Sequence, residues 1–155
     1  MTVAAVPLVV RTPVRGTSVG LPAVGDPVFA EAMVGPGTAV DPDRAAGEAV
    51  APISGQIATL HPHAFVVVDA EGRGVLVHLG VDTVELKGEG FELAAARGED
   101  VQAGQPLVRW NPAAVEGGGR SPLCPVVALD ASPDQLTDVV TAGPVREGDA
   151  LFSWR

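Results

Sequence analysis

Cysteine and aromatic residues are scarce in this 155-residue sequence, and both shortages restrict what it can be. The single cysteine, Cys124, excludes an internal disulfide, and its apolar neighbours predict a buried structural thiol in a reducing compartment. Tyrosine is missing, and Phe and Trp together make up 4% of the residues. Apolar residues still reach 46%, with valine prominent, and such a composition favours strands over helices.

Positive charge is also in short supply. Lys87 is the only lysine, the arginines are scattered along the chain, and the net charge is −9. Nucleic-acid binding depends on clustered Lys and Arg side chains, so we expect no nucleic acid among the partners. An acidic surface suits a basic protein partner because complementary charge speeds encounter, although plain solubility explains the same charge.

Apolar runs are too short in this sequence to cross a bilayer. Residues 1–10 are apolar, but Pro7 interrupts them, no basic residue precedes them, and a membrane span needs about 20 residues. We therefore expect no membrane insertion and a cytoplasmic location. The length predicts one domain over residues 1–155, with residues 1–11 as a loose N-terminal tail.

Glycine and proline, by contrast, are abundant, at 19 and 14 residues, and so many helix breakers indicate a fold rich in turns. Two internal similarities suggest a duplicated β unit. Residues 12–17 (TPVRGT) resemble residues 51–56 (APISGQ), and the spacing Val-x-x-Gly-x-x-Leu-x-x-Trp occurs at residues 101–110 and again at 145–154. We predict an all-β fold, an antiparallel β-sandwich with an internal pseudo-repeat.

Helical signals are brief. Asn111-Pro112 and Ser132-Pro133 each combine a cap residue with proline at the first helical position, which predicts one or two short helices at the rim. Residues 35–49, rich in Gly, Asp and Ala, are expected to form a mobile surface loop. Residues 85–89 alternate charged and uncharged side chains, as on an exposed strand face.

All three histidines fall on a predicted hairpin, and two of them, His63 and His78, are expected to meet. Residues 61–69 and 74–78 are apolar runs joined by a polar, glycine-bearing linker. If the whole linker forms the loop, Phe65 pairs with His78, and His63 lies diagonal to His78 with Cα atoms about 7–8 Å apart. A two-residue loop within the linker leaves both histidines on the same face. Two imidazoles should therefore converge on one exposed patch.

A long stretch from Val77 to Phe91, together with several shorter ones, carries a resemblance to a known family. The shorter stretches are His63-Ala64-Phe65, Pro27-Val28-Phe29-Ala30-Glu31 with Val34-Gly35, Val50-Ala51-Pro52 with Gly55, and Pro125-Val126-Val127. With these residues, which span about residues 12–154, the sequence resembles the glucose-type IIA phosphocarriers of the bacterial phosphoenolpyruvate-dependent sugar phosphotransferase system.

The resemblance implies that His78 is phosphorylated on Nε2 and that His63 supports the phosphoryl group. Such a carrier would accept the group from the phosphohistidine of HPr and pass it to the IIB domain of a sugar permease, without a metal, nucleotide or other cofactor. Attack through one nitrogen of His78 requires the proton on the other, and the Gly80 carbonyl is the candidate acceptor. A protonated His63 would then neutralise the phosphoryl oxygens.

The resemblance also implies that both partners dock in turn on an apolar patch around the histidines. The candidate residues are Val28, Phe29, Met33, Val34, Leu76 and Val84, with Phe29 the strongest candidate. Asp82 lies on the His78 side by alternation and either orients the imidazole or caps a turn. His61 departs from the family, in which some members carry threonine there, so an imidazole replaces a hydroxyl that could hydrogen-bond His63.

Two other functions stay open on the sequence alone. His61 and His63 lie on one predicted strand face, and with His78 they could hold a catalytic zinc ion in a hydrolase. A non-catalytic regulatory homologue would keep the fold and the patch without turning over phosphate. Taken singly, a histidine on a strand is more often a partly buried structural residue than a catalyst.

Overall fold

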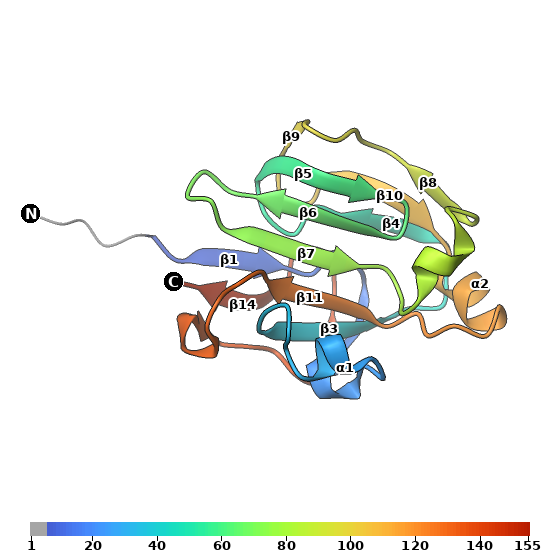
Figure 1. Ribbon diagram of the computed structural model, residues 1–155, viewed down its shortest axis with the longest axis horizontal. Helices are drawn as coiled ribbons and strands as arrows, with labels where there is room; N and C mark the ends of the chain where they lie inside the picture. Colours follow the sequence, from blue (N-terminus) through green and yellow to red (C-terminus); the bar gives the residue numbers. More distant parts are fainter. Residues whose placement is uncertain (1–5) are drawn as a thin grey trace, which may run out of the picture.

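Three antiparallel sheets form the framework of the computed structural model, which describes residues 6–155 (Figure 1). The largest has the strand order β13-β2-β3-β11-β7-β6-β5-β9. These strands are β2 (Gly16–Ser18), β3 (Gly37–Pro42), β5 (Gly55–His61), β6 (Ala64–Val68), β7 (Gly74–His78), β9 (Asp100–Val101), β11 (Cys124–Ala128) and β13 (Pro144–Val145). Two three-stranded sheets are formed by β1 (Leu8–Arg11), β14 (Ala150–Trp154) and β12 (Leu136–Thr137), and by β4 (Gly47–Val50), β10 (Pro106–Trp110) and β8 (Phe91–Leu93).

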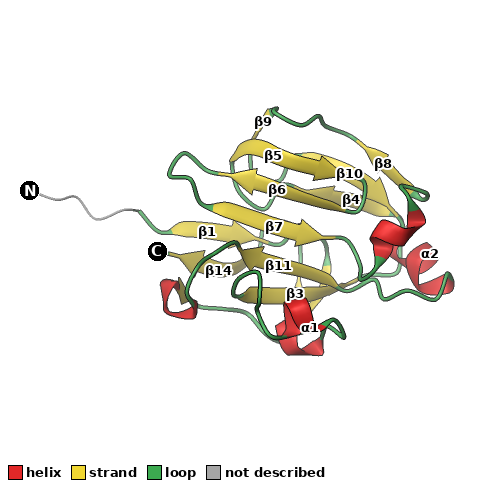
Figure 2. Cartoon of the chain, viewed as in Figure 1, coloured by secondary structure: helices red, strands yellow, loops and turns green. Residues whose placement is uncertain are grey.

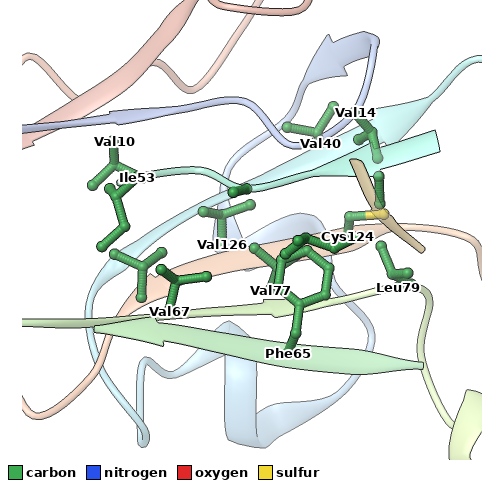
Figure 3. Close-up of a cluster of buried hydrophobic side chains, with 14 of the residues drawn as sticks. Val10, Val14, Val40, Ile53, Phe65, Val67, Val77, Leu79, Cys124 and Val126 are labelled. Carbon is green, nitrogen blue, oxygen red and sulfur yellow. The ribbon is translucent and has the colours of Figure 1, made fainter. Parts of the chain in front are cut away.

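Side chains from all three sheets meet in one core, so the fold is the predicted all-β sandwich. Along β6 and β7 every second side chain points into this core, and Phe65, Val67 and Val77 are fully buried there. Figure 3 shows these residues gathered with Val10 from the opposite layer. The predicted buried thiol is confirmed, because Cys124 lies in the core and burial raises its pKa to about 12.

The internal pseudo-repeat is confirmed by matching backbone hydrogen bonds. Thr12 N–H donates to the carbonyl of Asp149, and in the other copy Ala51 N–H donates to the carbonyl of Gln105, each at 2.9 Å. At the strand level, β13 pairs with β2 as β9 pairs with β5. In the same way β14 pairs with β1 as β10 pairs with β4. The two halves of the chain therefore build the sandwich by the same plan.

Residues 19–36, which we call the cover segment, pack on the outer face of the large sheet. They contain the 3-10 turn η1 (Leu21–Ala23) and the short helix α1 (Pro27–Ala30). A second apolar cluster lies beneath them, in which Phe29 of the cover segment packs with Ala39 of β3 and Val127 of β11. Figure 2 shows α1 beside β3, while the outer faces of β6 and β5 carry no helix. One half of the outer face is thus covered and the other half open.

The remaining helices are short, as the sequence predicted. In α2 (Pro112–Gly117) the Asn111 side chain accepts a hydrogen bond from Ala113 N–H at 3.0 Å. In η3 (Pro133–Gln135) the Gln135 side chain accepts one from Ser132 N–H at 2.7 Å, so the predicted cap residue Ser132 is part of a capping box. Within residues 6–155, no helix has the length and apolar character required to span a bilayer.

Two expectations about irregular segments are wrong. Leu8–Arg11 form strand β1, paired with β14, and Val10 is fully buried, so the loose tail predicted over residues 1–11 does not include them. Residues 1–5 of that tail lie outside the described residues. Residues 35–49 contain all of β3 and most of β4, so the predicted mobile loop is wrong. The internal repeat requires strands there, which the Gly and Asp residues obscure in the sequence.

Candidate functional site

The hairpin of β6 and β7 positions His78, although its register differs by one residue from the predicted one. Phe65 pairs with Val77, and Ala64 pairs with His78. The loop is longer than expected because the Asp69 side chain accepts hydrogen bonds from the backbone N–H groups of Glu71 and Arg73. The predicted pairing of Phe65 with His78 is therefore wrong: Phe65 enters the core, and His78 faces outward beside Ala64.

His63 reaches His78 from a tight turn. Pro62 and His63 connect β5 to β6, since His61 pairs with Ala64. The ring centroids of His63 and His78 lie 5.3 Å apart in an edge-on arrangement. Leu79 N–H donates to the His63 carbonyl at 2.7 Å, which ties the two histidine segments together. The predicted convergence of the two imidazoles is confirmed, but the turn produces it, not a diagonal strand contact.

The environment of His78 fixes both its tautomer and its charge. Its Nδ1 lies 2.5 Å from the Gly80 carbonyl oxygen, and because a carbonyl can only accept, Nδ1 carries the proton and Nε2 keeps its lone pair. Burial lowers the pKa of His78, and the bond to Gly80 and the charges of Asp26 and Asp82 oppose this only in part. The imidazole is neutral at pH 7 and can act as a nucleophile.

Gly80 is the residue that the turn after β7 requires. Its φ of +87° is rarely adopted by other residues, and a Cβ there would lie 2.6 Å from Thr83 Cγ2 and 2.9 Å from the Ser121 carbonyl oxygen. The peptide that carries the Gly80 carbonyl is held from its other side, where Val81 N–H donates to Ser121 at 2.9 Å. The acceptor of the His78 proton is therefore fixed before any ligand binds.

His61 and His63 form a second ring contact. Their centroids are 5.6 Å apart and their planes differ by 16°, so the His61 ring stacks on that of His63. Burial lowers the pKa of His63, and positive charge on His78 or His61 lowers it further. His63 is thus neutral at pH 7 in the absence of a nearby anion.

The predicted docking residues divide into an exposed and a buried group. Val28, Met33 and Val84 are 41%, 68% and 57% exposed. Val34 and Leu76 are half-buried against the second apolar cluster. Phe29, expected to be exposed, is buried, because α1 turns its ring inward onto the cluster. Its ring centroid lies 5.4 Å from that of His78, so Phe29 forms one wall of the histidine site.

Acidic side chains line an open groove beside His78. Asp26, Asp82 and Glu85 line it together with Arg120, which approaches Glu85 at 3.6 Å. Asp82 is exposed and makes no capping hydrogen bond through its side chain, so the expected alternative role as a turn cap is not seen. Asp26 was missed by the sequence analysis, although Asp26-Pro27 repeats the cap-plus-proline signal of Asn111-Pro112.

The segment after the acidic groove is not the expected strand. Residues 83–86 form the 3-10 turn η2 (Thr83–Leu86), and Asp82 and Lys87 on either side of it have left-handed backbone angles. The alternating charges of residues 85–89 lie on a turn because Gly80, Gly88 and their neighbours bend the chain away from sheet geometry. As a result the segment lies across the end of the hairpin, where a Cβ at Gly88 would touch Pro62.

The proposed zinc site finds no support. Over residues 6–155 no group of three or more His, Cys, Asp or Glu side chains has an arrangement that could hold a metal ion. The His61 ring stacks on that of His63, whereas zinc ligands point their nitrogens at a common centre.

Comparison with known proteins decides the family. Residues 8–133 match the family of the phosphoenolpyruvate-dependent sugar phosphotransferase system, EIIA 1. The chain belongs to this family. A glucose-specific EIIA component of the phosphotransferase system from Staphylococcus aureus (strain MSSA476) is 33% identical over 144 residues, which is 92% of this chain and 86% of the relative. A second one, from Staphylococcus epidermidis (strain ATCC 12228 / FDA PCI 1200), is 31% identical over 142 residues, with 90% and 84% covered.

Comparison of the fold with solved structures supports the same family. The structure of the glucose permease IIA from Mycoplasma capricolum superposes with a TM-score of 0.89 at 33% identity and covers 100% of both chains. This member of the EIIA family is therefore a phosphocarrier of the sugar phosphotransferase system and acts in sugar uptake. Neither the hydrolase nor the non-catalytic alternative is supported by these relatives.

Proposed function

We propose that His78 Nε2 is the atom that accepts the phosphoryl group, from the phosphohistidine of HPr, and donates it to the IIB domain of a sugar permease. The observation that carries this proposal is the Nδ1 contact to the Gly80 carbonyl. It leaves the Nε2 lone pair free on a neutral ring, as in-line attack on phosphorus requires. The same proposal places the chain in the cytoplasm.

The transfer is balanced without a metal or a second proton donor. The Nε2 lone pair forms a bond to phosphorus while the donor's N–P bond breaks and its electron pair stays on the donor nitrogen. The proton stays on Nδ1 of His78, hydrogen-bonded to Gly80. When the group moves on to the next acceptor, the ring leaves as neutral imidazole, which is a better leaving group than imidazolate.

His63 supports the phosphoryl group in this proposal. The two rings are 5.3 Å apart, close enough for His63 to reach an oxygen of a phosphoryl group on His78. A dianion at that place raises the pKa of His63, because a nearby negative charge favours the protonated form. Because the pKa of His63 is lowered in the unphosphorylated state, His63 becomes positive only once His78 carries the phosphoryl group.

Docking of the two partners is proposed on the exposed apolar side chains beside the histidines. Val28, Met33 and Val84 provide the exposed apolar surface, and the half-buried Val34 and Leu76 lie next to it. Apolar contact of this kind is reusable by successive partners. The acidic groove adjoins this apolar surface. We propose that HPr presents basic side chains, which the groove would attract.

Phosphorylation with purified components tests the assignment. Wild-type protein is incubated with phosphoenolpyruvate, enzyme I and HPr, and its mass is measured under alkaline conditions that preserve phosphohistidine. We expect one phosphoryl group on wild type and none on His78→Ala, whose fold is checked by thermal unfolding. Full labelling of folded His78→Ala would show that His78 is not the acceptor.

A further inference from the structure

Thr83 is a buried polar residue to which the reaction so far gives no role. It is fully buried at the start of η2, and its hydroxyl donates to the Leu79 carbonyl at 2.8 Å. The N–H of the same Leu79 donates to the His63 carbonyl. Leu79 lies between His78 and Gly80, so the hydroxyl of Thr83 acts on the backbone that joins the nucleophile to its proton acceptor.

The methyl group of Thr83 packs on the same turn. Its Cγ2 would lie 2.6 Å from a Cβ at Gly80, so it leaves space at this position for glycine alone. The turn contains two left-handed residues, Gly80 at +87° and Asp82 at +58°. Left-handed angles are unfavourable for a residue other than glycine, so such a turn persists only where its surroundings hold it. Thr83 contacts it through both branches of its side chain.

We propose that Thr83 is a positioning residue for phosphoryl transfer: by holding the Leu79–Gly80 backbone it aims the Gly80 carbonyl at Nδ1 of His78. This inference rests on the proposed role of His78 and deepens it. The expected consequence is chemical, because the Gly80 carbonyl keeps the proton on Nδ1 both before attack and in the phosphorylated ring. A carbonyl that is free to turn away would let the proton exchange between the two nitrogens and occupy Nε2.

The chain offers a matched control in Thr12. It too is fully buried, and its hydroxyl donates to a backbone carbonyl, that of Val14, at 2.5 Å. Thr12 lies between β1 and β2, in the layer that meets β14, and contributes to none of the histidine contacts described. A valine at either position removes one buried hydroxyl of the same kind with little change in volume.

The experiment compares Thr83→Val, Thr83→Ser and Thr12→Val by two readouts. Nitrogen-15 NMR of the histidine rings reports the tautomer of His78 and the solvent exchange of its Nδ1 proton. Rapid-quench measurement gives the rate of phosphoryl transfer from phospho-HPr. For Thr83→Val we expect faster exchange, a smaller fraction with the proton on Nδ1, and a rate about tenfold lower, as loss of one buried hydrogen bond permits. Thr83→Ser, which keeps the hydroxyl, should retain most of the wild-type tautomer fraction and of the wild-type transfer rate.

Thr12→Val should lower thermal stability about as much as Thr83→Val and leave both readouts at wild-type values. A His78 spectrum of Thr83→Val that overlays the wild type, or equal changes in Thr12→Val, would overturn the proposal. If Thr83→Val does not fold, Thr83→Ala is measured instead, and the wild-type spectrum must show a slowly exchanging hydroxyl proton on Thr83; its absence overturns the proposal as well. Because the tautomer is read without phosphate, failure of His78 as the acceptor would be recognised separately.

Discussion

The pseudo-repeat allows two connections in the molecule to be compared directly: β2 to β3 and β5 to β6. The two pairs of strands are equivalent in the repeat, since β2 pairs with β13 as β5 pairs with β9. The first connection is the cover segment, residues 19–36, with η1 and α1. The second is the two-residue turn Pro62-His63. One scaffold thus carries a long connection and a very short one in equivalent places.

The unequal connections explain where the site lies. Under the cover segment the outward side chain of β11, Val127, is fully buried. On the neighbouring strand β7 the outward His78 stays partly exposed, because within residues 6–155 no helix covers β6 beside it. The short turn supplies His63, and the long connection places Phe29 against His78. The candidate site therefore lies at the boundary between the covered and the open half of the large sheet, and its residues come from loops placed on a symmetric scaffold.

Removing the side chain of the short connection should have the largest effect. His63→Ala removes the cation that we propose to neutralise the phosphoryl oxygens, and general acid and positioning effects of this kind are typically about 10²–10⁴-fold in rate. We expect phosphorylation by HPr to persist and transfer to IIB to fall by that factor, measured by rapid quench with labelled phosphate. His63→Gln retains a hydrogen-bond donor and should fall between the two. An unchanged transfer rate in His63→Ala would mean that the turn acts only as a connection.

Replacing Phe29, the buried side chain of the cover segment, should have a smaller effect, on the free energy of unfolding and on the pKa of His78. Phe29→Ala leaves a cavity under α1, and buried Phe→Ala changes typically cost about 3–5 kcal/mol. At this partly shielded edge we expect about 3 kcal/mol in denaturant unfolding. Water admitted beside His78 also weakens the burial that lowers its pKa, so this pKa should rise toward its ordinary value.

The sign of the pH dependence follows from that shift. In wild type the folded state binds a proton at His78 less readily than the unfolded chain does. The stability contributed by neutral His78 is therefore complete above the ordinary histidine pKa and is lost as pH falls toward the lowered pKa of the folded state. In Phe29→Ala this loss should be smaller, whereas Phe29→Leu, which keeps an apolar contact, should resemble wild type. An NMR titration of His78 that is identical in all three proteins would contradict this account.

The scaffold was more predictable from the sequence than the connections. Period-2 alternation and the repeated Val-x-x-Gly-x-x-Leu-x-x-Trp spacing sufficed for the sandwich, because core burial imposes both. The caps at Asn111 and Ser132 are local chemistry and were equally readable. Helix α1 carries the same signal at Asp26-Pro27 and was overlooked, since a four-residue helix leaves no apolar periodicity to support it.

The site was predictable in its residues but not in its geometry. The register error arose from Asp69, whose side chain closes a longer loop than the glycine at position 72 suggests. Phe29 could not be recognised as buried, because its burial depends on how the cover segment folds back onto Val127. The role of Ser121 rests on a backbone bond to Val81 from a segment distant in sequence, which no local pattern encodes. The bond from the Thr83 hydroxyl to the Leu79 carbonyl spans four residues, but it forms only because the intervening turn is left-handed at Gly80 and Asp82.

Replacing His61, which precedes the short turn Pro62-His63, should give the smallest effect. The His61 ring is exposed and stacked on that of His63, and its positive charge lowers the pKa of His63 only as the third contribution, after burial and His78. His61→Thr removes both the ring and the charge, whereas His61→Phe keeps a stacked ring without charge. If the charge of His61 is what matters, both variants should raise the pKa of His63. His63 then stays protonated, and transfer to IIB stays fast, up to a slightly higher pH. If stacking is what matters, only His61→Thr should differ from wild type, through a more mobile His63 ring and slower transfer at every pH. Proton NMR titration of His63 together with the pH–rate profile separates these outcomes, and profiles of both variants that overlay the wild type would confine the site to His63 and His78.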